Sequence, residues 1–310
     1  KLTGFKELLA IDWDKNSEET FKINFPEIPF LNIDIKEVKG DNILKLCNIK
    51  KGELDILDGS PPCQGFSTAG KRKVFDNRND LFKEFVRLIK ELQPKVFVME
   101  NVSGMIKGKM KGRFKEIILT LKSLNYNVKC KLLNAKYYNV PQSRQRLFFI
   151  GIRNDLNLEP IFPIPNNKII TMKEILKDCP DYVDRPMKEW LKKAYFELNG
   201  RNTTKIFKKY KGTIAGSFST KLLKMNRSSQ TLMKSEISVS GLLHPIKPRY
   251  LNLHELRRIC SFHDDFKFTD RMNAVKRMGN AVMPNQMRAI AETIKDKILI
   301  PYYSKIEIKP

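Results

Sequence analysis

The segment 59–67 constrains this chain more than any other. It reads Gly-Ser-Pro-Pro-Cys-Gln-Gly-Phe-Ser and follows directly on a short apolar run at 54–58. Proline fixes φ and lacks a backbone donor, so Pro61 and Pro62 hold Cys63 in a preset extended turn. The flanking glycines let the backbone come close to a ligand. The segment favours a positioned thiolate nucleophile. A buried cysteine in an ordinary loop is the alternative.

The charge balance indicates a polyanionic partner. The 310 residues include 58 Lys and Arg against 34 Asp and Glu, a formal net charge of +24. Lys and Arg neutralise phosphates and release counterions, which favours nucleic acid; an AT-rich genome, which enriches Lys, is the alternative. None of the five cysteines forms a C-x-x-C pair, so we expect no zinc site and a reducing cytosol. No apolar run reaches membrane-spanning length, and no signal peptide is visible.

Apolar runs alternate with amphipathic patterns over the first half of the chain. Buried strands are predicted at 8–12, 54–58, 95–100 and 147–152. Helices are predicted by apolar spacing at 79–93 and 113–124. This alternation favours an α/β fold with a mostly parallel sheet, in which ligands bind beyond the carboxyl ends of the strands.

The pattern changes at about residue 153. Prolines cluster there, and the stretch 201–227 holds eight basic residues and no acid. We predict a first domain at 1–152 and a smaller, irregular domain at 153–262. A C-terminal segment, 263–310, carries a further helical pattern and is expected to return to the first domain.

Four short motifs occur in a fixed order. They are Pro61-Pro62-Cys63-Gln64, Glu100-Asn101-Val102, Gln142-Ser143-Arg144-Gln145-Arg146 and Gly279-Asn280-Ala281-Val282. In this order they resemble the S-adenosylmethionine-dependent cytosine-C5 DNA methyltransferases of bacterial type. Further segments agree, at 10–14, 24–26, 76–81 and 249–258. The resemblance covers nearly the whole chain and implies a Rossmann-like catalytic domain followed by a target-recognition domain.

The resemblance implies a catalytic set. C5 of cytosine is too weak a nucleophile to take a methyl group, so a thiolate first adds at C6 and later leaves. Cys63 matches that thiolate, Glu100 would hydrogen-bond N3 and supply a proton, and Arg146 would contact O2 and damp the developing charge. Arg144 would hold the Cys63 loop or the substrate backbone. Helix capping for Glu100, and phosphate or surface pairing for the arginines, are the alternatives.

S-adenosylmethionine is the cofactor that the resemblance implies. An acid at a strand end is the usual acceptor for ribose hydroxyls, which assigns Asp12, and Trp13 would stack on the adenine. Core packing is the alternative for Trp13. The other expected cofactor contacts are Asp34 and Ile35 beside the adenine, Gly59 and Leu81 in the same pocket, and Asn280 at the methionine end.

Duplex DNA is the expected substrate, and the target cytosine would be flipped into the pocket. Pro62 would offer its carbonyl to the exocyclic amine. The other expected contacts are Gln64 and Ser67 along the nucleotide, and Lys221, Lys224, Arg227 and Thr231 in the recognition domain. Ordinary loop roles and solvated surface are the alternatives. We expect a monomeric, cytoplasmic bacterial enzyme without a metal. The sequence leaves open whether it has a cognate restriction endonuclease or stands alone.

The chain departs from the family at a few positions. The family opens with a glycine-rich loop, of which only the tail, 2–5, is present; we expect the rest to precede Lys1, and a split or defective protein is the alternative. Asn139 replaces a common glycine, and Asn tolerates positive φ better than most residues. Two other functions stay open. One is the tRNA-methylating branch of the family, whose Cys-Phe-Thr element is not found here. The other is a catalytically silent DNA-binding relative, which the intact motifs disfavour.

Overall fold

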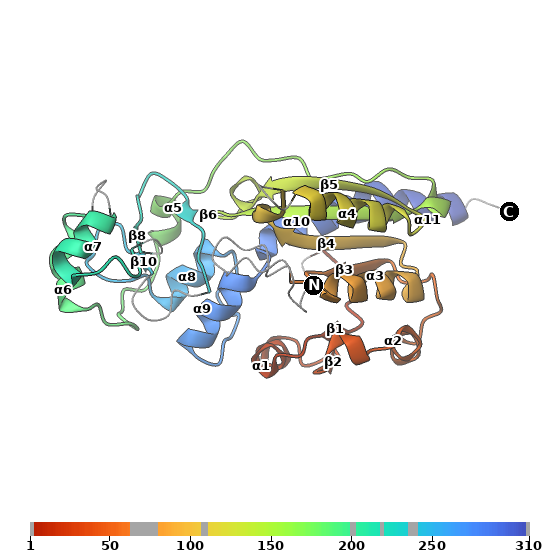
Figure 1. Ribbon diagram of the computed structural model, residues 1–310, viewed down its shortest axis with the longest axis horizontal. Coiled ribbons are helices and arrows are strands. Elements are labelled where there is room, and N and C mark those ends of the chain that lie inside the picture. The colour runs from red at the N-terminus through yellow and green to blue at the C-terminus, as the bar shows by residue number, and fades with distance from the viewer. Residues whose placement is uncertain are drawn as a thin grey trace.

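Two groups of elements lie along the long axis of the molecule (Figure 1). The computed structural model describes residues 3–62, 80–106, 111–198, 203–217, 220–234 and 241–307. The first group is a sheet with helices on both faces, and the second is an irregular region with short elements. α8 (Leu253–Ile259) and α9 (Arg271–Asn280) lie between the two groups (Figure 1).

The main sheet has the strand order β3–β4–β7–β5. β3 (Ile56–Gly59) pairs parallel with β4 (Val96–Val102), and β7 (Gln145–Arg153) runs antiparallel to β4 and to β5 (Tyr126–Asn134). Three of these four strands therefore run in one direction, which confirms the α/β class and the mostly parallel sheet. The run at 8–12 forms β1 (Ala10–Ile11), which pairs parallel with β2 (Phe30–Leu31) in a separate small sheet.

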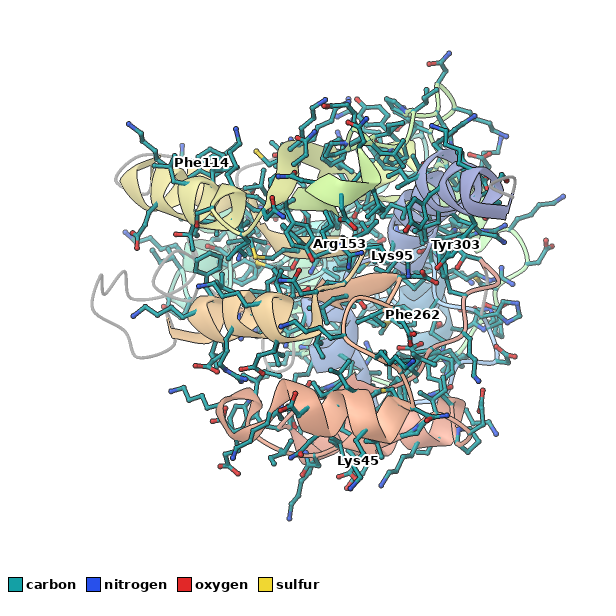
Figure 2. The ribbon with its side chains drawn as sticks, turned by 90° about the vertical axis from the view of Figure 1, so that its right-hand side faces the viewer. Lys45, Lys95, Phe114, Arg153, Phe262 and Tyr303 are labelled. Carbon is teal, nitrogen blue, oxygen red and sulfur yellow. The ribbon has the colours of Figure 1, made fainter. Side chains whose placement is uncertain are left out.

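Helices cover both faces of the main sheet because its strands are apolar on both sides. α3 (Asp80–Leu92) and α4 (Lys111–Lys122) pack on one face in a cluster that includes Phe97 and Phe149. α10 (Pro284–Ile294), a π-helical turn (Lys295–Leu299) and α11 (Ile300–Glu307) cover the other face. Figure 2 shows Phe114 of α4 and Tyr303 of α11 on opposite sides of the strands. The predicted helices are confirmed.

A charged cluster anchors α11 to the end of the sheet where β4 begins. The Lys95 ammonium is buried and lies 3.1 Å from the Asp55 carboxylate, which also accepts from the Tyr303 hydroxyl at 2.5 Å. Arg153 lies beside this cluster (Figure 2) and donates to the carbonyls of Gly52 and Gln93. These charged groups stabilise the packing of α11 at the start of β4, whereas Glu100 lies near its end.

A small N-terminal layer packs below α3. It contains α1 (Lys15–Asn24), a 3-10 turn (Ile35–Glu37) and α2 (Gly40–Cys47). Val38 and Ile43 bury their side chains against Leu88 and Leu92 of α3. Asp14 caps α1 and also pairs with Lys276 and Arg277, so the C-terminal helix α9 is tied to the start of α1.

The irregular region follows β7. Its helices are α5 (Met172–Leu176), α6 (Glu189–Tyr195) and α7 (Thr203–Lys211), and its strands are β8 (Lys221–Leu222), β9 (Ser229–Gln230) and β10 (Leu242–Leu243). β9 pairs parallel with β6 (Gln142–Ser143), which joins this region to the strand entering β7. Among the described residues, no helix is long and apolar enough to cross a membrane.

Candidate active site

Glu100 and Arg146 form a close ion pair near the carboxyl end of β4. Arg146 Nε lies 2.8 Å from Glu100 Oε1, and the two side chains are only 16% and 12% exposed. The sheet sets this contact, because β4 and β7 are antiparallel neighbours with Val102 opposite Arg146 and Glu100 opposite Phe148. Arg146 is therefore offset by two residues from Glu100 across the ladder, and its long side chain spans the offset.

Burial dominates the electrostatics of this pair. The pKa of Glu100 is raised because burial desolvates the carboxylate, while Arg146, Arg144 and a hydrogen bond with Ser60 act in the opposite direction. The pKa of Arg146 is lowered by burial, against the attraction of Glu100. A carboxyl group with a raised pKa beside a fixed cation is suited to exchange a proton with a bound base.

Asn101 connects the end of β4 to the loop that leads to Cys63. Its side chain is 4% exposed, and its Nδ2 donates to the carbonyl of Pro61 at 3.2 Å. Its Oδ1 accepts from the backbone N–H of Val102 at 2.9 Å. The start of the Pro-Pro-Cys loop is therefore held beside Glu100. Cys63 itself lies outside the described residues.

Arg144 is buried rather than directed at a cleft. It is 1% exposed, and its guanidinium donates to the carbonyls of Leu232 at 3.2 Å and Gly279 at 2.9 Å. Its backbone N–H donates to Asn134 Oδ1 at 3.0 Å. Desolvation, and then the charge of Arg146, lower the pKa of Arg144 to about 9.

Two acids and an exposed indole follow the strands of the small N-terminal sheet. The Asp12 carboxylate comes directly after β1 and accepts from the Asp14 N–H at 3.1 Å, and the Asp12 carbonyl accepts from Asn32 at 3.0 Å. Trp13 is 76% exposed, so the core-packing interpretation of this residue is wrong. Asp34 is exposed and caps the 3-10 turn by accepting from the Lys36 N–H at 3.0 Å.

The remaining predicted cofactor residues come from three other elements. Gly59 ends β3, and a Cβ atom there would lie 2.7 Å from the Phe85 ring, so the position has no room for a side chain. Leu81 lies in the first turn of α3 and is half-buried, as is Ile35. Asn280 is the exposed last residue of α9.

A basic groove of about 390 Å³ lies where β6 meets the irregular region. Its lining includes Lys136, Lys224 and Arg227, and it includes no acid. Lys224 and Arg227 are exposed, and Lys221, in β8, is half-buried. Thr231 does not face solvent freely, because its hydroxyl donates to the Ser143 carbonyl at 2.7 Å. Lys136 was not among the predicted residues, and only tertiary pairing brings it to this groove.

Comparison with known proteins identifies the family. The family of C-5 cytosine-specific DNA methylases matches residues 1–296. A Type II methyltransferase of Haemophilus parahaemolyticus, M1.HphI, is 35% identical over 94% of this chain and 81% of its own length. A second from Xanthomonas oryzae, M.XorII, is 31% identical over 94% of this chain and 80% of its own length. The chain belongs to the C-5 cytosine-specific DNA methylases.

A solved structure agrees on the fold of this methyltransferase. It is an Escherichia coli prophage protein described as a DNA modification methyltransferase, with a TM-score of 0.74 and 24% identity over 96% of this chain and 94% of its own. The enzyme is thus a DNA (cytosine-5-)-methyltransferase, as the motifs predicted. Among the described residues, no group of three or more His, Cys, Asp or Glu side chains could hold a metal ion.

The structure brings part of the predicted set together. Glu100 meets Arg146 directly, whereas the guanidinium of Arg144 bonds to two backbone carbonyls. Pro62 is described and exposed, but Gln64 and Ser67 lie outside the described residues, as Cys63 does. The sequence motif contained Asn101, but no role was predicted for it. The available signal was its position directly after Glu100.

Proposed function

We propose that this methyltransferase transfers a methyl group from S-adenosylmethionine to C5 of a flipped-out cytosine through a covalent Cys63–C6 adduct. The observation that carries the proposal is the Glu100–Arg146 pair, held 2.8 Å apart beside the start of the Pro-Pro-Cys loop. A proton donor, a fixed cation and a thiolate are the three groups that activation of the pyrimidine ring needs.

Each protein group has a defined place in the proposed reaction. The Cys63 thiolate forms a bond to C6, and the ring electrons move toward N3, where Glu100 donates its proton. Arg146 stabilises the negative charge on O2 and keeps the Glu100 carboxyl oriented. C5 then carries the electron density that accepts the methyl group. Loss of the C5 proton to a base and departure of the Cys63 sulfur restore the ring, and Glu100 recovers its proton from N3.

The residues near β1 and β2 suit an adenosine. Carboxylates accept hydrogen bonds from ribose hydroxyls and from an exocyclic amine, and Asp12 and Asp34 present such groups after β1 and β2, respectively. The exposed Trp13 ring offers an apolar face for the adenine. Gly59 lets the end of β3 pack closely against the Phe85 ring, where a side chain has no room. S-adenosylmethionine supplies the electrophilic methyl group when bound.

The substrate contact would lie along the basic groove, between the segment that carries Lys136 and a recognition domain at 153–262. Lys136, Lys224 and Arg227 line it without an acid, which suits the phosphates of a duplex. Both relatives described above are Type II methyltransferases, which supports a place in a restriction–modification system with a short specific target.

Bisulfite sequencing of a plasmid from cells that express the gene tests the activity and reports the target. We expect the cytosines at one short sequence to resist bisulfite conversion completely. In cells that express Cys63→Ala, no cytosine should be protected. A duplex carrying 5-fluorocytosine at that sequence should trap the enzyme as an adduct through Cys63, and the same assay with tRNA should give none. Methyl transfer to tRNA alone, or transfer by Cys63→Ala, would contradict the proposal.

A further inference from the structure

Arg144 is a charge buried where three distant segments of the chain meet. The side chain is 1% exposed, and among the described residues no carboxylate lies within salt-bridge distance of it. Its guanidinium instead donates to Leu232 and Gly279, which lie 88 and 135 residues further along the chain. Burying a cation is costly unless its donors are satisfied. The two carbonyls satisfy Nη1 and Nη2 and offset part of this cost, whereas Nε has no hydrogen-bond partner among the described residues.

A second contact joins the same two segments. The residues 229–234, hereafter the docked segment, pair with β6 through β9, and Thr231 bonds to the Ser143 carbonyl at 2.7 Å. On its other side the docked segment touches α9. A Cβ atom on Gly279 would lie 2.4 Å from the backbone nitrogen of Lys234 and 2.6 Å from its Cα. The glycine therefore permits this close approach of two backbones.

We propose that Arg144 is a positioning residue that makes the docked segment and the end of α9 move as one unit. If either carbonyl withdrew, a buried charged donor would lose its partner, and such a loss is penalised far more than the loss of an exposed bond. Displacement of one segment is therefore resisted until the other follows. Arg144 acts through these segments and not on the reacting atoms.

The consequence is a link between the two substrates. This inference rests on the proposed function, in which the docked segment belongs to the DNA-recognition domain and Asn280, directly after Gly279, contacts the cofactor. If one unit carries both the DNA contact and the cofactor contact, target DNA that fixes the position of the docked segment also fixes the position of Asn280. Binding of the duplex and of the cofactor should then be coupled, and each ligand should tighten the other by the same factor.

Binding measurements with the full chain test this. The affinity for S-adenosylhomocysteine, which cannot react, is measured with and without the target duplex found by bisulfite sequencing. In the wild type we expect the duplex to tighten binding by about tenfold, and in Arg144→Met by less than about twofold. Arg153→Met is the matched control, because Arg153 also donates to two backbone carbonyls but at the other end of β7. It should lower the unfolding temperature and keep the tenfold factor.

Gly279→Ala disrupts the contact between the docked segment and α9 from the side of α9, and it leaves Arg144 in place. Its methyl group must push the docked segment away, so the coupling factor should fall as in Arg144→Met. Because both changes act on one contact, the double variant should lose no more coupling than either single variant. This second variant keeps the test decisive if Arg144→Met does not fold, which thermal unfolding reports first.

Three results would overturn the inference: no coupling in the wild type, full coupling in a folded Arg144→Met or in Gly279→Ala, or an equal loss in Arg153→Met. Failure of the proposed function looks different, because the wild type would then transfer no methyl group to any duplex.

Discussion

Acidification should destabilise this methyltransferase through one buried imidazole. His244 is 4% exposed, and its Nδ1 accepts from the backbone N–H groups of Ile246 and Lys247 at 3.3 and 3.1 Å. Protonation would place a hydrogen on the nitrogen that those two donors already face. Burial, and then the charges of Arg249 and Lys247, lower the pKa of His244 to about 4, although Glu255 acts in the opposite direction.

The size of the effect follows from this pKa. An unfolded histidine has a pKa of about 6.5. Between pH 6.5 and pH 4, His244 therefore binds a proton in the unfolded chain and stays neutral in the folded chain. The free energy of unfolding therefore falls as the pH falls through this window, and the contribution of neutral His244 is largely lost below pH 4. From pH 7 to pH 4.5 the loss amounts to about 2.5 kcal/mol.

Urea unfolding at pH 7, 6, 5 and 4.5 measures this loss, with His244→Asn as the reference. The Asn Oδ1 atom can accept from the same backbone N–H groups, and the side chain does not titrate. We expect the wild type to lose about 2.5 kcal/mol more than the variant over this range. Unfolding free energies that fall in parallel, within about 0.5 kcal/mol, would refute the reasoning, because the two chains differ only in this titrating group.

Three further outcomes can be measured. Glu100→Gln should lower kcat by about 10²- to 10⁴-fold and keep DNA binding. Because burial raises the Glu100 pKa, the wild-type rate should fall on the alkaline side of the pH profile as this proton is lost. The pH profile of the variant should lack this alkaline decrease. Gly59→Ala would place a Cβ atom 2.7 Å from the Phe85 ring, so thermal unfolding should show a loss of about 1–3 kcal/mol, and calorimetry weaker S-adenosylhomocysteine binding. Arg227→Ala should reduce the slope of log K against log salt for DNA binding by about 0.9, and the exposed Lys297→Ala should not.

The sequence predicted the two inner strands of the main sheet, β4 and β7, because they are buried on both faces. Such strands are continuous apolar runs, and β4 buries all four side chains from Val96 to Met99. β5 was missed because it lies at the edge of the sheet, where Lys129 and Lys131 reach solvent and dilute the apolar pattern. The two-residue strands β6 and β9 carry no local pattern at all, since only their pairing with each other defines them.

The sequence predicted only those residues of the candidate site that belong to recognisable motifs. The motifs named Glu100 and Arg146, and the sheet register explains why these two meet. Asn139 was expected to tolerate a positive φ, and its φ is 55°. The partners of Arg144 could not be foreseen, because its contacts join residues 88 and 135 positions apart, and such separations leave no periodic signal.

The stretch 142–146 shows why one short motif can carry so much. Its first two residues pair with β9, Arg144 donates to the docked segment and α9, and Arg146 pairs with Glu100. Side chains alternate along an extended chain, so a single residue inserted between Arg144 and Arg146 would shift Arg144 out of register with Arg146, which the β4–β7 ladder holds beside Glu100. The spacing of this motif is therefore fixed from both sides, by the β6–β9 pairing before Arg144 and by the sheet register after it.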